Sequence, residues 1–174
     1  MVSDYFVEPK SRKEIRVLAY ILREKLGLQN ALWIPVVELL DVLAETIDGF
    51  SYEVVPDSEM PDEIHAETDI VTGHITIKES VYERACNGEG RDRMTIAHEI
   101  GHFFMLYLYG FKLHRNYKNR KIEAPNDPEW QAKCFAGEFL IGSHLIEGMS
   151  TFEIAEECGV SYEAAKYQLT HKDK

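Results

Sequence analysis

The run MTIAHEIGHFFML, from Met94 to Leu106, combines a His-Glu-x-x-His pattern with the periodicity of an amphipathic helix. Residues four positions apart lie on one helix face about one turn apart, so His98 and His102 can bind the same ion. The apolar residues fall on the opposite face, which predicts a helix that is buried on one side and carries two imidazoles on the other. Those expected to face the core are Ile96, Ile100, Phe103, Phe104 and Tyr107.

Glu99 lies about a quarter turn from His98, beside the histidine face of this helix. That position suits a base that acts on metal-activated water better than it suits a direct ligand. Gly101 lies beside the same face, where the missing side chain is expected to leave room for a metal and a substrate. Because a catalytic zinc ion usually has three protein ligands and an open position, a third ligand has to come from another segment.

Five downstream residues could provide this third ligand by residue type: His114, Glu123, Asp127, Glu129 and Glu138. Helical geometry favours Glu129, because Ala132 and Ala136 share its face and would let its helix lie close against the HEIGH helix. Glu138 would point the opposite way, and Asp127 is better explained as a helix cap. The other two candidates fall in a polar stretch that we expect to be a loop.

The sequence predicts an α+β fold, in which a small sheet of about three strands packs on helices. Helical spacing, capping residues and glycine stops predict helices over 12–26, 35–48, 79–86 and 128–141, with a final pair of short helices within 151–169. Alternating patterns predict strands over 51–55, 64–70 and 74–78, and a turn at 71–73 joins the last two. We expect one domain over 1–148, with a small helix-turn-helix-like tail over 149–174 packed on it.

Composition excludes several classes of protein. A net charge of −11 repels phosphates, so general binding to nucleic acid is not expected. The longest apolar run is too short to span a bilayer, and the first residues lack the pattern of a signal peptide. The three cysteines are odd in number and widely spaced, which predicts no disulfide framework and favours the cytoplasm.

Two sequence blocks, RDRMTIAHEIGH and EWQAKCFAGEFLIG, resemble those of the ImmA/IrrE family of metallopeptidases. The resemblance implies a compact zincin-like fold with a gluzincin-type site. His98, His102 and Glu129 would bind Zn²⁺ or another divalent ion, and Glu99 would be the catalytic acid and base. Lys133 departs from the family pattern, which usually has Asn or Asp there to orient a ligating histidine.

The resemblance also implies a function. Members of the family are typically cytoplasmic endopeptidases that cleave a helix-turn-helix repressor of a phage, a mobile element or a stress locus. One alternative is a catalytically weak or inactive binding module that regulates a repressor by association. Another is a DNA-binding regulator that uses its tail, although few side chains suited to reading bases lie on the second tail helix.

Two details of catalysis are left open by the sequence. The strand over 74–78 is expected to form the sheet edge along which a substrate lies extended. Residues that could stabilise the oxyanion by their type are Tyr107, Tyr109, His114 and Tyr117.

Overall fold

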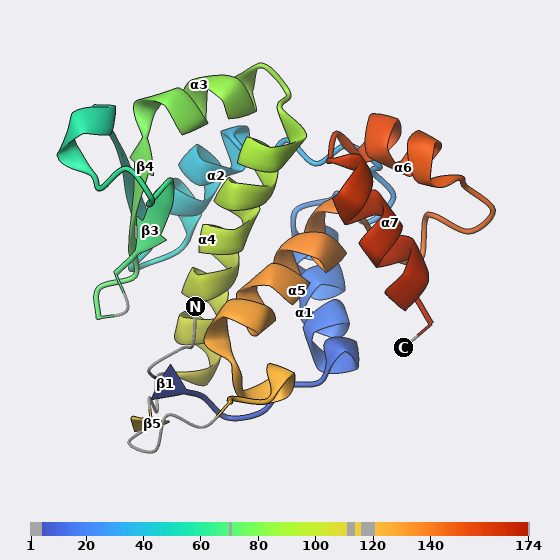
Figure 1. The fold of residues 1–174 in the computed structure, drawn as a ribbon, viewed down its shortest axis with the longest axis horizontal. Coiled ribbons are helices and arrows are strands. Elements are labelled where there is room, and N and C mark those ends of the chain that lie inside the picture. The colour runs from blue at the N-terminus through green and yellow to red at the C-terminus, as the bar shows by residue number, and fades with distance from the viewer. Residues whose placement is uncertain (1–4, 70, 111–113, 116–120, 174) are drawn as a thin grey trace.

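The computed structural model describes residues 5–69, 71–110, 114–115 and 121–173. Helix α4 (Gly90–Tyr109) runs through the middle of the molecule, with the sheet on one side (Figure 1). On the other side lie helices α1 (Arg12–Lys25), α6 (Thr151–Cys158) and α7 (Tyr162–His171). The apolar face of α4 is buried as predicted at Ile96, Ile100 and Phe103. Tyr107 is an exception, because it is 54% exposed and stacks on Phe103 near the end of the helix. The expectation that Tyr107 faces the core was therefore wrong.

The main sheet is small and mixed. It contains β2 (Ser51–Val55), β3 (Ala66–Thr68) and β4 (His74–Lys78) in the order β2-β4-β3. Strand β4 pairs in parallel with β2 and antiparallel with β3, so it is the central strand. The prediction that β4 forms the edge was therefore wrong, and β3 is the edge strand that lies next to α4. The α+β class and the three-stranded sheet are confirmed.

Three helices precede α4 in the chain. Helix α1 (Arg12–Lys25) begins with the predicted capping box between Ser11 and Glu14. Helix α2 (Glu38–Thr46) begins later than predicted, because the Val36 N–H donates to the Ile34 carbonyl in a tight turn before the first helical residue. Helix α3 (Glu79–Cys86) has its predicted bounds.

Helix α5 (Pro128–Leu140) packs on both α4 and α1. Gly101 of α4 is needed for this approach, because a Cβ there would lie 3.0 Å from the Ala132 carbonyl oxygen and 3.0 Å from the Phe135 ring. The predicted close approach of the alanine face is thus confirmed at Ala132. Gly101 makes room for α5, however, and not for a metal or substrate as the sequence suggested.

The last two helices, α6 (Thr151–Cys158) and α7 (Tyr162–His171), form the predicted hairpin. Gly159 joins them in the left-handed conformation at φ 60°, and any side chain there would collide with the Trp33 ring. Arg93 of α4 is buried against the same ring and donates hydrogen bonds to the carbonyls of Ile34 and Gly159. One buried guanidinium therefore ties the C-terminal hairpin to the central helix.

A second pair of strands lies near the C-terminal end of α4, where β1 (Tyr5–Phe6) runs antiparallel to β5 (His114–Arg115). Two short 3-10 helices, η1 (Asp57–Glu59) and η2 (Ala124–Asn126), complete the elements in the described part of the chain. None of the described helices is both long enough and apolar enough to cross a membrane.

Candidate metal centre

Three possible metal ligands from two helices converge where α4 and α5 cross. The Nε2 atoms of His98 and His102 are 3.0 Å apart. The Glu129 carboxylate lies between them, with Oε2 at 3.2 Å from His98 Nε2 and Oε1 at 3.2 Å from His102 Nε2. Within the ranges that the structure describes, this is the one group of His, Cys, Asp or Glu side chains placed to share an ion.

Local sequence explains how the three side chains are brought together. The spacing of four residues places the two imidazoles on adjacent turns of α4, with ring centroids 4.6 Å apart. On α5, Pro128 occupies the first turn and Asp127 is the cap, since its carboxylate accepts a hydrogen bond from the Glu129 N–H. The cap predicted at Asp127 is confirmed, and it fixes the turn from which Glu129 projects.

The spacing of the three donors fits a metal ion. Zinc bonds of about 2.0–2.1 Å in a tetrahedral arrangement place neighbouring ligand atoms about 3.3 Å apart. The separations of 3.0 and 3.2 Å are close to that value. Two imidazole nitrogens and one carboxylate form a set that accepts zinc and several other divalent ions.

Electrostatics keeps the Glu129 carboxylate ionised. Its hydrogen bonds with His102 and His98 hold its pKa well below the usual range. Burial lowers the pKa of His102, but its hydrogen bond with Glu129 and the charges of Glu99 and Glu129 outweigh this effect and raise the pKa above the ordinary value. In the absence of an ion, protons therefore stabilise the cluster, and a cation has to displace them.

Glu99 is held outside this cluster by the sheet. Its side chain is buried, and the Thr68 hydroxyl lies 2.7 Å from Oε2. Thr68 is the last residue of β3 and pairs with buried Ile75, so its side chain shares the face of the sheet that packs toward α4. Sequence reasoning missed Thr68, because its contact with Glu99 depends on the order of the strands.

Two of the other predicted candidates lie away from the cluster. Glu138 is buried at the far end of α5, where Arg12, Arg16 and Ser143 bind its carboxylate. Glu123 is exposed before η2. His114 lies on β5 but its side chain is not described, and Tyr117 falls outside the described residues.

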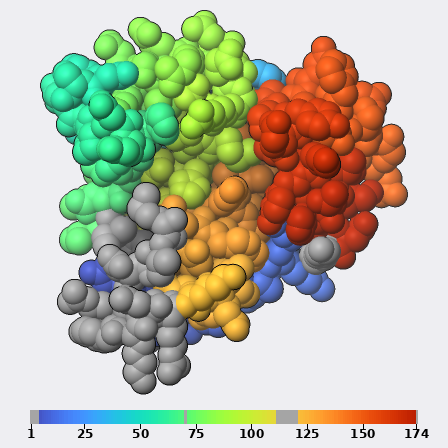
Figure 2. All heavy atoms as spheres, viewed as in Figure 1, coloured from blue at the N-terminus to red at the C-terminus, as the bar shows by residue number. Residues whose placement is uncertain are grey.

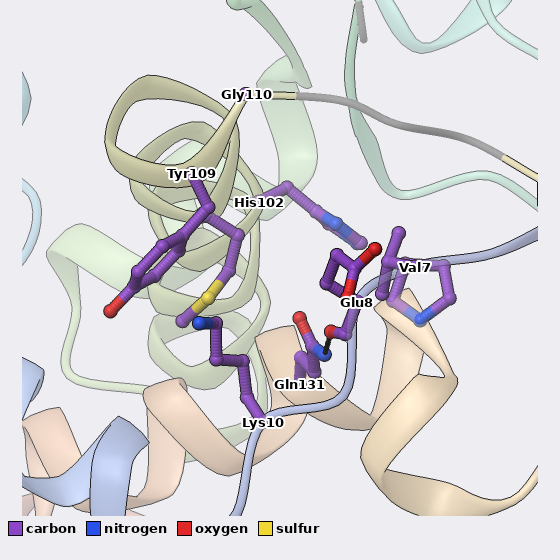
Figure 3. Close-up of a pocket in the computed structure, with 9 residues that line it drawn as sticks. Val7, Glu8, Lys10, His102, Tyr109, Gly110 and Gln131 are labelled. Carbon is purple, nitrogen blue, oxygen red and sulfur yellow. Dashed lines mark hydrogen bonds between the residues drawn. The ribbon is translucent and has the colours of Figure 1, made fainter.

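A small cavity of about 150 Å³ lies on the His102 side of the cluster (Figure 3). The His102 imidazole points toward the segment that carries Val7 and Glu8, and Tyr109 lines the same cavity. The Lys10 ammonium lies 3.9 Å from the centre of the Tyr109 ring. The N-terminal segment is therefore a wall of the candidate site, which the sequence did not indicate.

A larger hollow of about 580 Å³, here called the His98 pocket, lies on the other side of the cluster. His98 and the exposed Lys133 both line it, together with residues of α7. Across the described part of the chain, no hydrogen bond joins Lys133 to either histidine. The lysine at the family's orienting position thus faces an open hollow.

The chain is similar to known proteins in sequence and in fold. Residues 57–170 match the model of the peptidase family described as the IrrE N-terminal-like domain. A solved structure of a Mycobacterium tuberculosis transcriptional regulator is similar to 91% of this chain with a TM-score of 0.59 and 16% sequence identity. That likeness shows a shared fold alone, and this chain spans 46% of the regulator. A search of curated proteins finds no match.

Proposed function

Because the chain belongs to the family of IrrE N-terminal-like metallopeptidases, we propose that it is a zinc-dependent endopeptidase that cleaves a regulatory protein. The observation that carries this proposal is the convergence of His98, His102 and Glu129, with Glu99 of the same helix close enough for its charge to help raise the pKa of His102. A zincin-like fold places a base and three ligands together for peptide hydrolysis. Another divalent ion could take the place of zinc with this donor set.

Within this proposal, each residue has a distinct role. When bound, the metal polarises the scissile carbonyl and acidifies a water molecule. Glu99 accepts a proton from the attacking water and delivers it to the nitrogen of the leaving amine. The Thr68 hydroxyl donates to Oε2 of Glu99 and so holds the carboxylate in one orientation, with Oε1 left to accept the proton.

The substrate is expected to lie along β3. No described strand pairs with the outer edge of β3, and its last residue touches Glu99. An extended peptide that adds to this edge would pass the ligands of the metal. Main-chain hydrogen bonds of this kind suit a protein substrate whose cleaved segment is unfolded or becomes extended on binding.

We propose a helix-turn-helix repressor as the substrate, encoded by a phage, a mobile element or a stress locus. The support is the resemblance of the HEIGH block and the EWQAKCFA block to proteins that act on such repressors. The solved structure with a similar fold is that of a protein named as a transcriptional regulator. The three free cysteines are consistent with a cytoplasmic protein.

A second function is a binding module that controls a repressor by association. Lys133 favours it, because a lysine cannot accept the N–H of a ligating histidine and so gives that ring no support. Under this alternative the metal cluster would be structural, and the surface along β3 would bind the repressor without cleaving it.

One experiment separates the two functions. Purified protein loaded with zinc is incubated with a repressor encoded beside its gene, and the products are measured by mass spectrometry. We expect a single cleavage with the wild type and none with Glu99→Gln, which keeps the metal ligands. An intact repressor that is bound equally by both proteins would overturn the endopeptidase and establish the binding module.

A further inference from the structure

We propose that the His98 pocket selects an acidic side chain of the substrate, next to the bond that is cleaved. This inference rests on the proposed endopeptidase function and names the chemistry that the enzyme would recognise. It also gives a role to Lys133, the residue that departs from the family pattern.

The pocket reaches the candidate metal centre at His98. Arg91, Met94, Thr95 and His98 line it from α4, and their spacing places all four on one stripe of that helix. His98 belongs to this stripe and also lies 3.2 Å from Glu129. A side chain that enters the pocket therefore comes from a residue close to the scissile bond.

Helices α5 and α7 form the remaining walls together with Arg12 of α1. In Figure 2 the red atoms of α7 lie beside the orange atoms of α5, next to the green atoms of α4. Met94 and Tyr167 give the pocket an apolar lining. Gln168 is buried and donates to the Ser143 hydroxyl, so its amide is already occupied. These walls suit the methylene groups of an incoming side chain better than a hydrated small ion.

The charge of the pocket is opposite to that of the protein. Arg91 and Lys133 are both exposed, and in the described part of the chain neither forms an ion pair. Arg12 also lines the pocket, but it is paired at 3.1 Å with Glu138, a carboxylate that it shares with Arg16. Glu163 is the one acidic residue in the lining. Two unpaired cations thus face one acid in a protein with a net charge of −11.

Charge complementarity identifies the occupant. A carboxylate can bind the Arg91 guanidinium in a bidentate manner and the Lys133 ammonium as a point charge. Glutamate and aspartate offer that carboxylate on a short apolar stem, which the lining around Met94 and Tyr167 accommodates. A basic side chain would meet two like charges and be rejected.

The test measures binding, so that it does not depend on turnover. Zinc-loaded Glu99→Gln protein is incubated with a library of random dodecapeptides, and the bound peptides are sequenced by mass spectrometry. We expect Glu and Asp to be enriched about fivefold over Gln and Asn at one position of the bound register. Adding Lys133→Glu or Arg91→Glu should abolish this preference or shift it toward Lys and Arg.

Lys25→Glu is the matched control, because it changes the net charge equally on an exposed residue of α1 outside the pocket lining. All three charged residues are exposed, so the variants should fold. Equal acidic enrichment in Lys133→Glu and Lys25→Glu would overturn the inference. So would competition by inorganic phosphate without any acidic preference among the peptides, which would indicate a small-anion site. Acid-selective binding by a protein that cleaves no repressor would refute the proposed function and leave the pocket's selectivity established.

Discussion

Helix α5 carries two glutamates that meet different partners at its two ends. Glu138 is 1% exposed at the side chain and is bound by Arg12 and Arg16, whose charges are permanent. Glu129 is 64% exposed at the side chain and is bound by His98 and His102, whose charges depend on protons. Both carboxylates are bound by two basic side chains, through nitrogen atoms at 3.1 or 3.2 Å. The difference lies in whether a metal ion from solution can take the place of protons on those partners.

Guanidinium groups cannot lose their protons, so the Glu138 cluster is complete within the protein and joins α1 to α5. The same carboxylate also accepts a hydrogen bond from Ser143, whose hydroxyl accepts one from Gln168 of α7. Imidazoles can give up their protons to a metal ion, so the Glu129 cluster is completed from outside. One helix thus carries a structural carboxylate at one end and a candidate metal ligand at the other.

Removing Glu138 should have the largest effect on stability. Glu138→Ala leaves two arginines without their acid in a buried site, and we expect a loss of about 3–5 kcal/mol in the free energy of unfolding. Urea unfolding of the metal-free protein measures this. Glu129→Ala is the control on the same helix and should change stability by less than about 1 kcal/mol. Equal losses in the two variants would remove the distinction between the clusters.

Metal binding should show the reverse order. Glu129→Ala removes one of the three candidate ligands, and we expect zinc affinity to fall by more than about a hundredfold, since even residues that only support a ligand contribute 10–100-fold. Competition with a chromophoric chelator measures the affinity. Glu123→Ala, an exposed glutamate that does not belong to the cluster, should leave it unchanged. Wild-type affinity in Glu129→Ala would show that another residue is the third ligand.

The two clusters should also respond differently to pH. Because the pKa of His102 is raised, protons compete with the metal up to and above its ordinary value, and zinc affinity should rise by about tenfold per pH unit for each proton displaced. Affinity should level off once the pH exceeds that raised pKa. Isothermal titration calorimetry in buffers of different ionisation enthalpy counts the protons released. A flat profile through pH 6–8 would contradict the expected competition.

In the metal-free protein the same groups stabilise the fold over a limited range. The raised pKa of His102 contributes stability that is complete below its unfolded pKa and is lost as the pH rises through the folded value. The lowered pKa of Glu129 contributes stability above its unfolded pKa, which is lost as the pH falls through the folded value. Their joint contribution is therefore greatest in mildly acidic solution, between the two ordinary pKa values. Zinc binds the deprotonated form of His102, so zinc binding and protonation compete.

The hydrogen bond from the Thr68 hydroxyl joins the sheet to Glu99 and can be removed without touching either glutamate of α5. Thr68→Val keeps the shape of the side chain but removes the hydrogen bond to Oε2, and we expect kcat for repressor cleavage to fall about fivefold with KM unchanged. Thr68→Ser should restore the rate. Thr76→Val on β4 is the control, because Thr76 pairs with Glu67 and projects from the opposite face of the sheet. A loss of rate that serine does not restore would point to packing alone.

Local sequence predicted those parts of the fold that depend on neighbouring residues. The capping box at Ser11 and the cap at Asp127 fixed the beginnings of two helices. Periodicity placed His98 and His102 on a face away from the core, and the small side chain at Ala132 correctly indicated a close approach of α5 to α4. These features arise from spacing within a single element.

The predictions that were wrong, and the contact that was missed, depend on how separate elements pack together. Whether β4 is central or at the edge depends on its pairing with β2, a strand that precedes it by more than twenty residues. Thr68 reaches Glu99 because of that same strand order. The exposure of Tyr107 depends on how far α4 extends beyond the core, and the role of Gly101 depends on which helix packs against it. None of these can be read from the residues of one element.

Lys133 connects the ligand end of α5 with the pocket beside it, and Lys133→Asn should separate two of its effects. Asparagine can accept the N–H of a ligating imidazole, so zinc affinity should rise by about threefold, less than the 10–100-fold of an established supporting residue. The same change removes one cation from the His98 pocket, so the preference for acidic peptides should weaken. Chelator competition and peptide selection on the same variant measure both effects. If affinity and preference change in opposite directions, this chain has exchanged support of a histidine for recognition of an acidic substrate.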